Sequence, residues 1–271
     1  ETVVWDYLQK YPTISNSIAR SLTGITDANK ITCNEIETDY VKLLSISDYL
    51  NSKNIFSFET LSYEPTFQTT DVVDKIMGNS FMPDLYKKYS TTPYLKAFTT
   101  AAERYGVSPV HLASRIIQEQ GINGSIASLG GKFTYNGKSY SGFFNFYNIK
   151  ATGENPAIQG LVWAMGGVNG TGTSYGRPWN TPYRGIVGGA RFISEDYISI
   201  GQNTLYFQKF DVSRDGGHYS HQYMQNITAQ ITEGIDAYTG YSNIKGIFDE
   251  PLVFIIPIYD NMPDSRVESP N

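Results

Sequence analysis

Apolar residues recur at intervals of three and four positions along much of the chain, which is the spacing of one face of an α-helix. The clearest case is residues 108–121, SPVHLASRIIQEQG, where Ser108 is a favourable N-cap and Gly121 a favourable residue just past the end. The predicted buried face comprises Val110, Ala113, Ile116 and Ile117. We therefore expect a central helix that is apolar on one side.

Similar patterns predict further elements on both sides of this helix. Helices are expected within residues 70–78, 92–106, 155–167, 181–201 and 221–238, with shorter amphipathic stretches in residues 1–60. Strands are expected over residues 134–140, 203–210 and 252–260, the first as a hairpin with an Asn136–Gly137 turn. The fold class is therefore α+β, mostly helical with a small β excursion.

The composition narrows the kinds of ligand. A net charge of −5 without a Lys/Arg cluster argues against nucleic acid. Only 17% of the 271 residues are charged, whereas 21 are tyrosines, whose flat rings with a terminal hydroxyl suit sugar rings. A tyrosine-rich surface is also common on extracellular bacterial proteins in general. One cysteine allows no internal disulfide, and no apolar run of about 18 residues predicts membrane insertion.

A carboxylate at the end of the central helix is the first candidate for chemistry. Glu119 lies two residues before Gly121, where it faces the negative end of the helix dipole. If its neighbours are apolar, both effects favour the protonated form, which a general acid in glycoside hydrolysis requires. The alternative is an ordinary solvated glutamate at a helix end, and position alone does not decide between the two.

Four segments resemble, in the same order, the catalytic domains of bacterial endo-β-N-acetylglucosaminidases, the autolysins of glycoside hydrolase family 73. They are HLASRIIQEQG (111–121), FFNFYNIKA (143–151), PWNTPYRGIVGGARFISEDYISIGQNTLYFQKF (178–210) and HYSHQYMQNI (218–227). The resemblance covers residues 70–271, which we expect to form the catalytic domain. We expect residues 1–69 to be a helical extension packed on it.

The resemblance implies a lysozyme-like fold with a small β lobe across a substrate groove. It also implies hydrolysis of the β-1,4 bond between N-acetylglucosamine and N-acetylmuramic acid, by a secreted protein acting in the cell wall. The expected partner is the peptidoglycan glycan strand, and no metal or organic cofactor is needed. We expect a monomer.

The roles implied for individual residues follow from the matching positions. Glu119 would be the general acid, and Tyr223 would orient the acetamido group of the substrate or the attacking water. Substrate-binding positions in the groove are expected at Asn145, Phe146, Tyr147 and Asn148, of which Asn148 stands where glycine is common, and at Tyr175 and Trp179, whose rings could stack on sugars.

The second catalytic group remains open. Glu154, 35 residues after Glu119, is a candidate base, although its Gly, Asn and Pro neighbours indicate a surface loop. Glu195 and Asp196 are lesser candidates. The third possibility is assistance by the N-acetyl oxygen of the substrate, held by Tyr223. A carboxyl separation of about 6.5 to 9.5 Å would predict inversion, and about 5 to 5.5 Å a covalent route.

Two other interpretations stay in view. A muramidase or lytic transglycosylase would share the fold and the glutamate, and a non-catalytic wall-binding module would leave Glu119 without a reaction. His218 and His221 have a spacing that could bind a metal, with Asp215 as a third ligand, but without a HExxH motif we interpret them as structural.

Overall fold

The computed structural model describes residues 53–213, 219–222, 229–249 and 252–257. The chain divides into two compact units, one formed by residues 61–199 with 239–252, and the other by 1–60, 200–238 and 253–271. Residues 61–69 thus belong with the helices that follow them. The helices expected in residues 1–52 lie outside the described residues, and the division into residues 1–69 and 70–271 stays a prediction.

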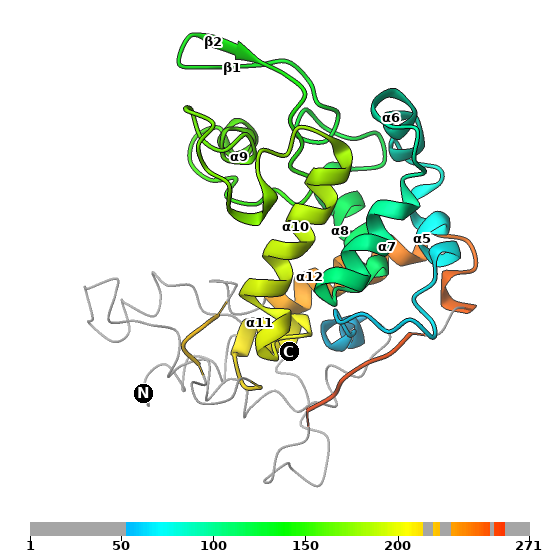
Figure 1. Ribbon diagram of the computed structural model, residues 1–271. Helices are drawn as coiled ribbons and strands as arrows, with labels where there is room; N and C mark the ends of the chain where they lie inside the picture. Colours follow the sequence, from blue (N-terminus) through cyan, green and yellow to red (C-terminus); the bar gives the residue numbers. More distant parts are fainter. Residues whose placement is uncertain (1–52, 214–218, 223–228, 250–251, 258–271) are drawn as a thin grey trace, which may run out of the picture. The chain divides into compact units, whose positions relative to one another are not determined.

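The unit of residues 61–199 is built mainly from helices. They are α5 (Thr70–Met77), α6 (Met82–Tyr89), α7 (Leu95–Tyr105), α8 (Pro109–Gln120), α9 (Pro156–Ala164) and α10 (Pro182–Asp196), with the 3-10 turns η2 (Ser174–Gly176) and η3 (Ile198–Ile200). Helix α12 (Ala229–Ser242) and the 3-10 turn η4 (Ile247–Asp249) follow later in the chain. Helix α7 packs against both α8 and α10, and α5 packs against α8, as the neighbouring ribbons in Figure 1 show.

Helix α8 has the predicted boundaries, and its cap explains where it begins. The Ser108 hydroxyl accepts the His111 backbone N–H at 3.1 Å, which satisfies one of the free donors of the first turn. The buried side chains of this helix include Val110, Leu112, Ala113 and Ile116. Ile117, which was expected on the same face, is only partly buried. The helix therefore presents one apolar side to its neighbours, and its C-terminal turn carries Glu119.

Helix α10 packs against aromatic rings along a stripe of glycines. A Cβ atom at Gly188 would lie 2.2 Å from the indole nitrogen of Trp179, and one at Gly189 would lie 2.2 Å from the Tyr147 ring. Gly185 makes a similar approach to Phe146, at 2.9 Å. These contacts are possible only without a side chain, so the glycines let large rings lie directly on the helix backbone.

The predicted hairpin is present and packs on α9. Strands β1 (Phe133–Tyr135) and β2 (Lys138–Tyr140) pair antiparallel, with Phe133 opposite Tyr140. Asn136 and Gly137 both have positive φ, 48° and 72°, as a type I′ turn requires. A small core joins the hairpin to the helix through Ala127, Phe133, Leu161, Val162 and Met165. In the described part of the chain, helices with a two-stranded antiparallel sheet confirm the α+β fold class, whereas the substrate groove remains a prediction.

The other unit corrects one predicted strand. Residues 203–210 form helix α11 (Leu205–Phe210) instead, because Thr204 caps it by accepting the Phe207 N–H at 3.0 Å. All six helical residues are buried, including Gln208 and Lys209. Buried and exposed positions therefore do not alternate along the segment as they would in a strand with one exposed face. The expected strand at 252–260 is reduced, within residues 252–257, to a single bridge between Phe254 and Glu59, next to the 3-10 turn η1 (Asn54–Phe58).

Candidate active site

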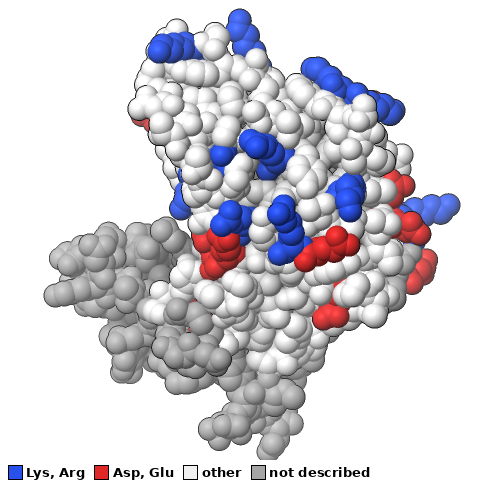
Figure 2. Space-filling view, viewed as in Figure 1, with Lys and Arg blue, Asp and Glu red and all other residues white. Residues whose placement is uncertain are grey.

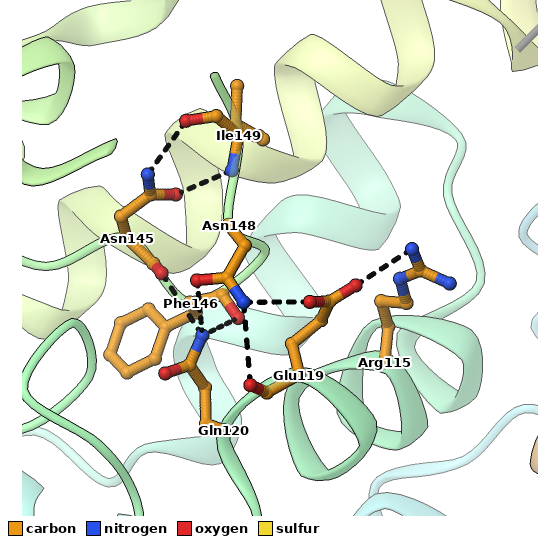
Figure 3. A network of polar contacts seen from close by, with 7 residues as sticks. All are labelled: Arg115, Glu119, Gln120, Asn145, Phe146, Asn148 and Ile149. Carbon is orange, nitrogen blue, oxygen red and sulfur yellow. Dashed lines mark hydrogen bonds and ion pairs between the residues drawn. The ribbon is translucent and has the colours of Figure 1, made fainter. Parts of the chain in front are cut away.

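Glu119 lies in the last turn of α8 with a donor on each carboxylate oxygen (Figure 3). Its Oε1 is 2.8 Å from an Arg115 guanidinium nitrogen, one helical turn earlier. Its Oε2 accepts a hydrogen bond of 2.8 Å from the Asn148 side-chain amide. The side chain of Glu119 is 21% exposed, so the carboxylate is mostly enclosed yet still reachable from solvent.

The expectation that apolar neighbours surround Glu119 is therefore wrong. Arg115 stands four residues earlier on the same helix face, and the segment after the hairpin folds across the helix end and presents Asn148. Both partners donate, so the carboxylate serves as an acceptor on both oxygens. To act as an acid it must carry a proton and free one oxygen from its donor.

Helix α8 also supplies the residue that holds Asn148 in place. The Gln120 side-chain nitrogen donates to the carbonyl oxygen of Phe146 at 2.9 Å and to the Asn148 side-chain oxygen at 3.2 Å. The Ser125 hydroxyl donates to the Gln120 side-chain oxygen. Gln120 is itself buried, at 6% exposure. Adjacent residues of one helix thus carry the candidate carboxylate, Glu119, and hold the loop that contacts it.

Asn145 closes the same loop from within. Its side-chain nitrogen donates to the carbonyl oxygens of Ile149 and Gly160, at 2.8 and 3.0 Å, and its side-chain oxygen accepts the Ile149 N–H at 3.0 Å. With 1% exposure, Asn145 is a structural anchor in this conformation. Inside this closed turn Asn148 has φ 49°, a left-handed conformation that asparagine tolerates better than most residues.

Three of the predicted sugar-binding side chains are buried. Phe146 and Trp179 have no exposed surface, and Tyr147 has 6%, because their rings pack against the glycine stripe of α10. A ring without a free face cannot stack on a sugar, so Trp179, which was expected to stack, does not offer its ring in this conformation. Phe146 and Tyr147, expected only to line the groove, are likewise enclosed. They support the loop that carries Asn148 instead. Asn145, also buried, contributes to that loop in the same way.

Tyr175 remains partly exposed, and its hydroxyl donates to Asp196 at 3.2 Å. Partial burial and this neighbouring carboxylate raise the pKa of Tyr175. On α10, which also carries Asp196, Glu195 forms an ion pair of 2.6 Å with Arg191. Asp196 and Glu195, the lesser candidates for a second carboxylate, thus have structural partners at the C-terminal end of α10.

Of the other two predicted catalytic residues, the structure describes only Glu154, for which no contact with Glu119, Arg115 or Asn148 is seen. Glu154 is exposed in the loop before α9, where the sequence placed it. Tyr223 lies outside the described residues. The described segment just before it, residues 219–222, is held by Asp211, whose carboxylate accepts the backbone N–H groups of Ser220 and His221 at 2.8 and 2.7 Å.

Neither a metal centre nor a membrane span is found in the part of the chain that the structure describes. In that part no three His, Cys, Asp or Glu residues come together as metal ligands. The His221 ring nitrogen Nδ1 lies 2.8 Å from the Gln202 side-chain oxygen, a structural contact, whereas His218 and Asp215 are outside the described residues. None of the described helices is both long and apolar enough to cross a membrane.

The charges of the chain are unevenly distributed. Residues 76–192, which include Glu119 and all of its contacts, contain eleven Lys and Arg residues and four Asp and Glu residues, although the whole chain has a net charge of −5. Figure 2 shows Lys and Arg side chains spread over much of one face. The exposed cations include Lys88, Lys132, Lys138, Lys150 and Arg184. The segment around Glu119 is thus positive, which the average charge conceals.

Comparisons with known proteins agree with the motifs. No model of a known protein family matches the chain. Over 212 residues, 77% of the chain, it is 31% identical to a β-N-acetylglucosaminidase of Bacillus subtilis (strain 168), of which the match covers 21%. Over 164 residues, 57% of the chain, it is 32% identical to a bifunctional autolysin of Staphylococcus aureus, of which the match covers 12%.

Solved structures extend the comparison to the fold. The structure of S. aureus glucosaminidase B shares 24% identity and a TM-score of 0.51, covering 73% of this chain and 69% of that one. The chain spans about a fifth or less of the length of the curated relatives it matches. Together these relatives confirm the resemblance that the four sequence motifs indicated.

Proposed function

We propose that this chain, a homologue of bacterial β-N-acetylglucosaminidases and autolysins, hydrolyses the β-1,4 bond between N-acetylglucosamine and N-acetylmuramic acid in peptidoglycan. The observation that carries the proposal is the setting of Glu119: a partly exposed carboxylate at a helix end, with each oxygen in contact with a donor. Its site of action is the cell wall, outside the cell. The enzyme acts as a monomer and uses no metal or organic cofactor.

Glu119 is the general acid in this proposal. It protonates the oxygen of the glycosidic bond as that bond breaks, and positive charge develops on the sugar ring. Afterwards Glu119 is a carboxylate, and its two oxygens can accept hydrogen bonds from Arg115 and Asn148.

The second group is either Glu154, as a base that activates water, or the acetamido oxygen of the substrate, oriented by Tyr223. Glu154→Gln separates the two possibilities. If Glu154 is the base, the variant loses most of its activity and azide restores part of it; if the substrate assists, Glu154→Gln retains activity and Tyr223→Phe loses it.

Turbidity loss of purified peptidoglycan tests the proposal. Glu119→Gln removes the acid but keeps the shape of the side chain, and we expect a loss of at least about a hundredfold. Asp84→Asn is the control, because Asp84 also forms an ion pair within a helix, with Lys87 on α6, at an exposed position that has no predicted role in catalysis. Full activity in Glu119→Gln would refute the role of Glu119.

A further inference from the structure

The side-chain amide of Asn148 has a defined orientation. The Gln120 nitrogen faces three carbonyl oxygens, those of Asn145, Phe146 and the Asn148 side chain, at 3.3, 2.9 and 3.2 Å. A flipped Gln120 would place its own oxygen against all three acceptors, so its NH₂ group must point there. The Asn148 oxygen therefore faces Gln120, and its NH₂ group faces Glu119 (Figure 3).

This NH₂ group occupies one particular oxygen of Glu119. It donates to Oε2 at 2.8 Å and lies 3.4 Å from the Glu119 backbone oxygen. An amide nitrogen is a donor only, so it stabilises an unprotonated oxygen, whether that oxygen belongs to a carboxylate or is the C=O of a carboxylic acid. A proton on Oε2 would point at another donor. Protonation at Oε2 is thereby disfavoured.

The other oxygen has a partner with more rotatable bonds. Oε1 pairs with Arg115, whose long side chain can turn about several bonds, whereas Asn148 is fixed by its short side chain and by Gln120. His111, the next titratable group along this helix face, adds no charge, because burial and then the charge of Arg115 lower its pKa to about 3.

We propose that Asn148 is a positioning residue, which holds Oε2 of Glu119 as a hydrogen-bond acceptor so that Oε1 carries and delivers the catalytic proton. This inference rests on the proposed role of Glu119. In the step, the bond from Oε1 to hydrogen breaks and the proton joins the glycosidic oxygen. The bond from that oxygen to the anomeric carbon breaks, and its electron pair stays on the oxygen. Arg115 turns aside to admit the substrate and then pairs again with the carboxylate.

The backbone at Asn148 provides clean variants. Because φ is 49°, glycine is compatible with the same backbone, so Asn148→Gly removes the amide without forcing the turn open. Asn148→Asp keeps the shape but replaces the donor with an acceptor, which would trap the Glu119 proton on Oε2. Asn136→Gly is the matched control, since Asn136 has φ 48° in the exposed hairpin turn.

The test measures kcat, KM, their pH dependence and the melting temperature on a soluble glycan substrate. We expect Asn148→Gly to lower kcat by about ten- to a hundredfold, the range for a hydrogen bond to a charged group, with KM nearly unchanged. Asn148→Asp should lower kcat further and move the alkaline limb of the profile to higher pH, because a second carboxylate favours the protonated form of the pair. Asn136→Gly should match the wild type.

Three distinguishable outcomes would refute either the positioning role of Asn148 or the proposed function. Wild-type kcat and pH profile in both Asn148 variants, together with an inactive Glu119→Gln, would refute the positioning role alone. Activity that falls only in proportion to the melting temperature, and returns on cooling, would also refute it, because the role would then be structural. An active Glu119→Gln would refute the proposed function itself.

Discussion

The glycine stripe of α10 gives the most demanding test of the packing. In Gly189→Ala the new methyl carbon would lie 2.2 and 2.4 Å from two carbons of the Tyr147 ring. These distances are more than an ångström shorter than an ordinary contact, and the ring is 6% exposed, so it cannot swing into solvent. Either the ring or the helix must move.

The expected change in the free energy of unfolding of Gly189→Ala is the difference between two opposing effects. In a helix interior, alanine is favoured over glycine by about 1 kcal/mol. Overpacking a core costs about 1–3 kcal/mol and occasionally more, and a clash this short with a buried ring belongs at the upper end. We therefore expect Gly189→Ala to lower the free energy of unfolding by about 2 kcal/mol. Because Tyr147 adjoins Asn148, activity should fall by more than the unfolded fraction explains.

The midpoint and the slope of urea unfolding give the change in the free energy of unfolding. Gly240→Ala is the matched control: Gly240 lies within α12, its φ is not positive, and nothing lies within 4 Å of an added Cβ. It should gain about 0.5–1 kcal/mol from the change in helix propensity. A Gly189→Ala variant as stable as Gly240→Ala, with unchanged activity, would refute the claim that the Tyr147 ring requires a bare helix backbone.

Three further predictions follow. In the folded protein the pKa of His111 is lowered from its ordinary value of 6.5 to about 3, so between these two pH values the unfolded chain binds a proton at His111 and the folded chain does not. The free energy of unfolding should therefore fall as pH drops from 6.5 toward 3. Urea unfolding of His111→Gln over the same pH range should show a weaker fall. Ser108→Ala removes the cap of α8 and should cost about 1 kcal/mol in thermal or urea unfolding, and an unchanged midpoint would contradict the role of the cap. Residues 76–192 carry an excess of positive charge, which should attract anionic cell walls. The fraction of protein that co-sediments with such walls should therefore fall when salt shortens the screening length from about 30 Å at 0.01 M to about 3 Å at 1 M. A fraction that rises with salt would mean that the net charge of −5 dominates.

Local signals in the sequence predicted the elements around the site well. The ends of α8 follow from Ser108 and Gly121, and the hairpin turn follows from Asn136 and Gly137, because each depends on a few adjacent residues. The apolar run at 203–210 was misassigned, since a short buried helix and a short buried strand share that pattern. Where a segment is buried on all sides, periodicity carries little information.

The position of Glu119 at the end of α8 was predicted from the sequence, whereas the residues that contact it were not. Glu119 follows from the motif and the helix end, and Arg115 could have been inferred from its i, i+4 spacing. The contacts of Gln120 with Ser125 and with the 145–148 loop depend on how the chain returns across the helix end, which no local pattern encodes. The burial of Trp179 depends on Gly188 of α10, a signal visible in the sequence as paired glycines within a helix.

The most direct test of the proposed reaction is the identity of the new reducing end. Peptidoglycan digested by the wild-type chain, then reduced with borohydride and analysed by mass spectrometry, should yield fragments that end in reduced N-acetylglucosamine, and Glu119→Gln should yield none. Fragments that end in reduced N-acetylmuramic acid would identify a muramidase, and 1,6-anhydro ends a lytic transglycosylase. Binding to walls without any cleavage product, identical in wild type and Glu119→Gln, would contradict catalysis altogether.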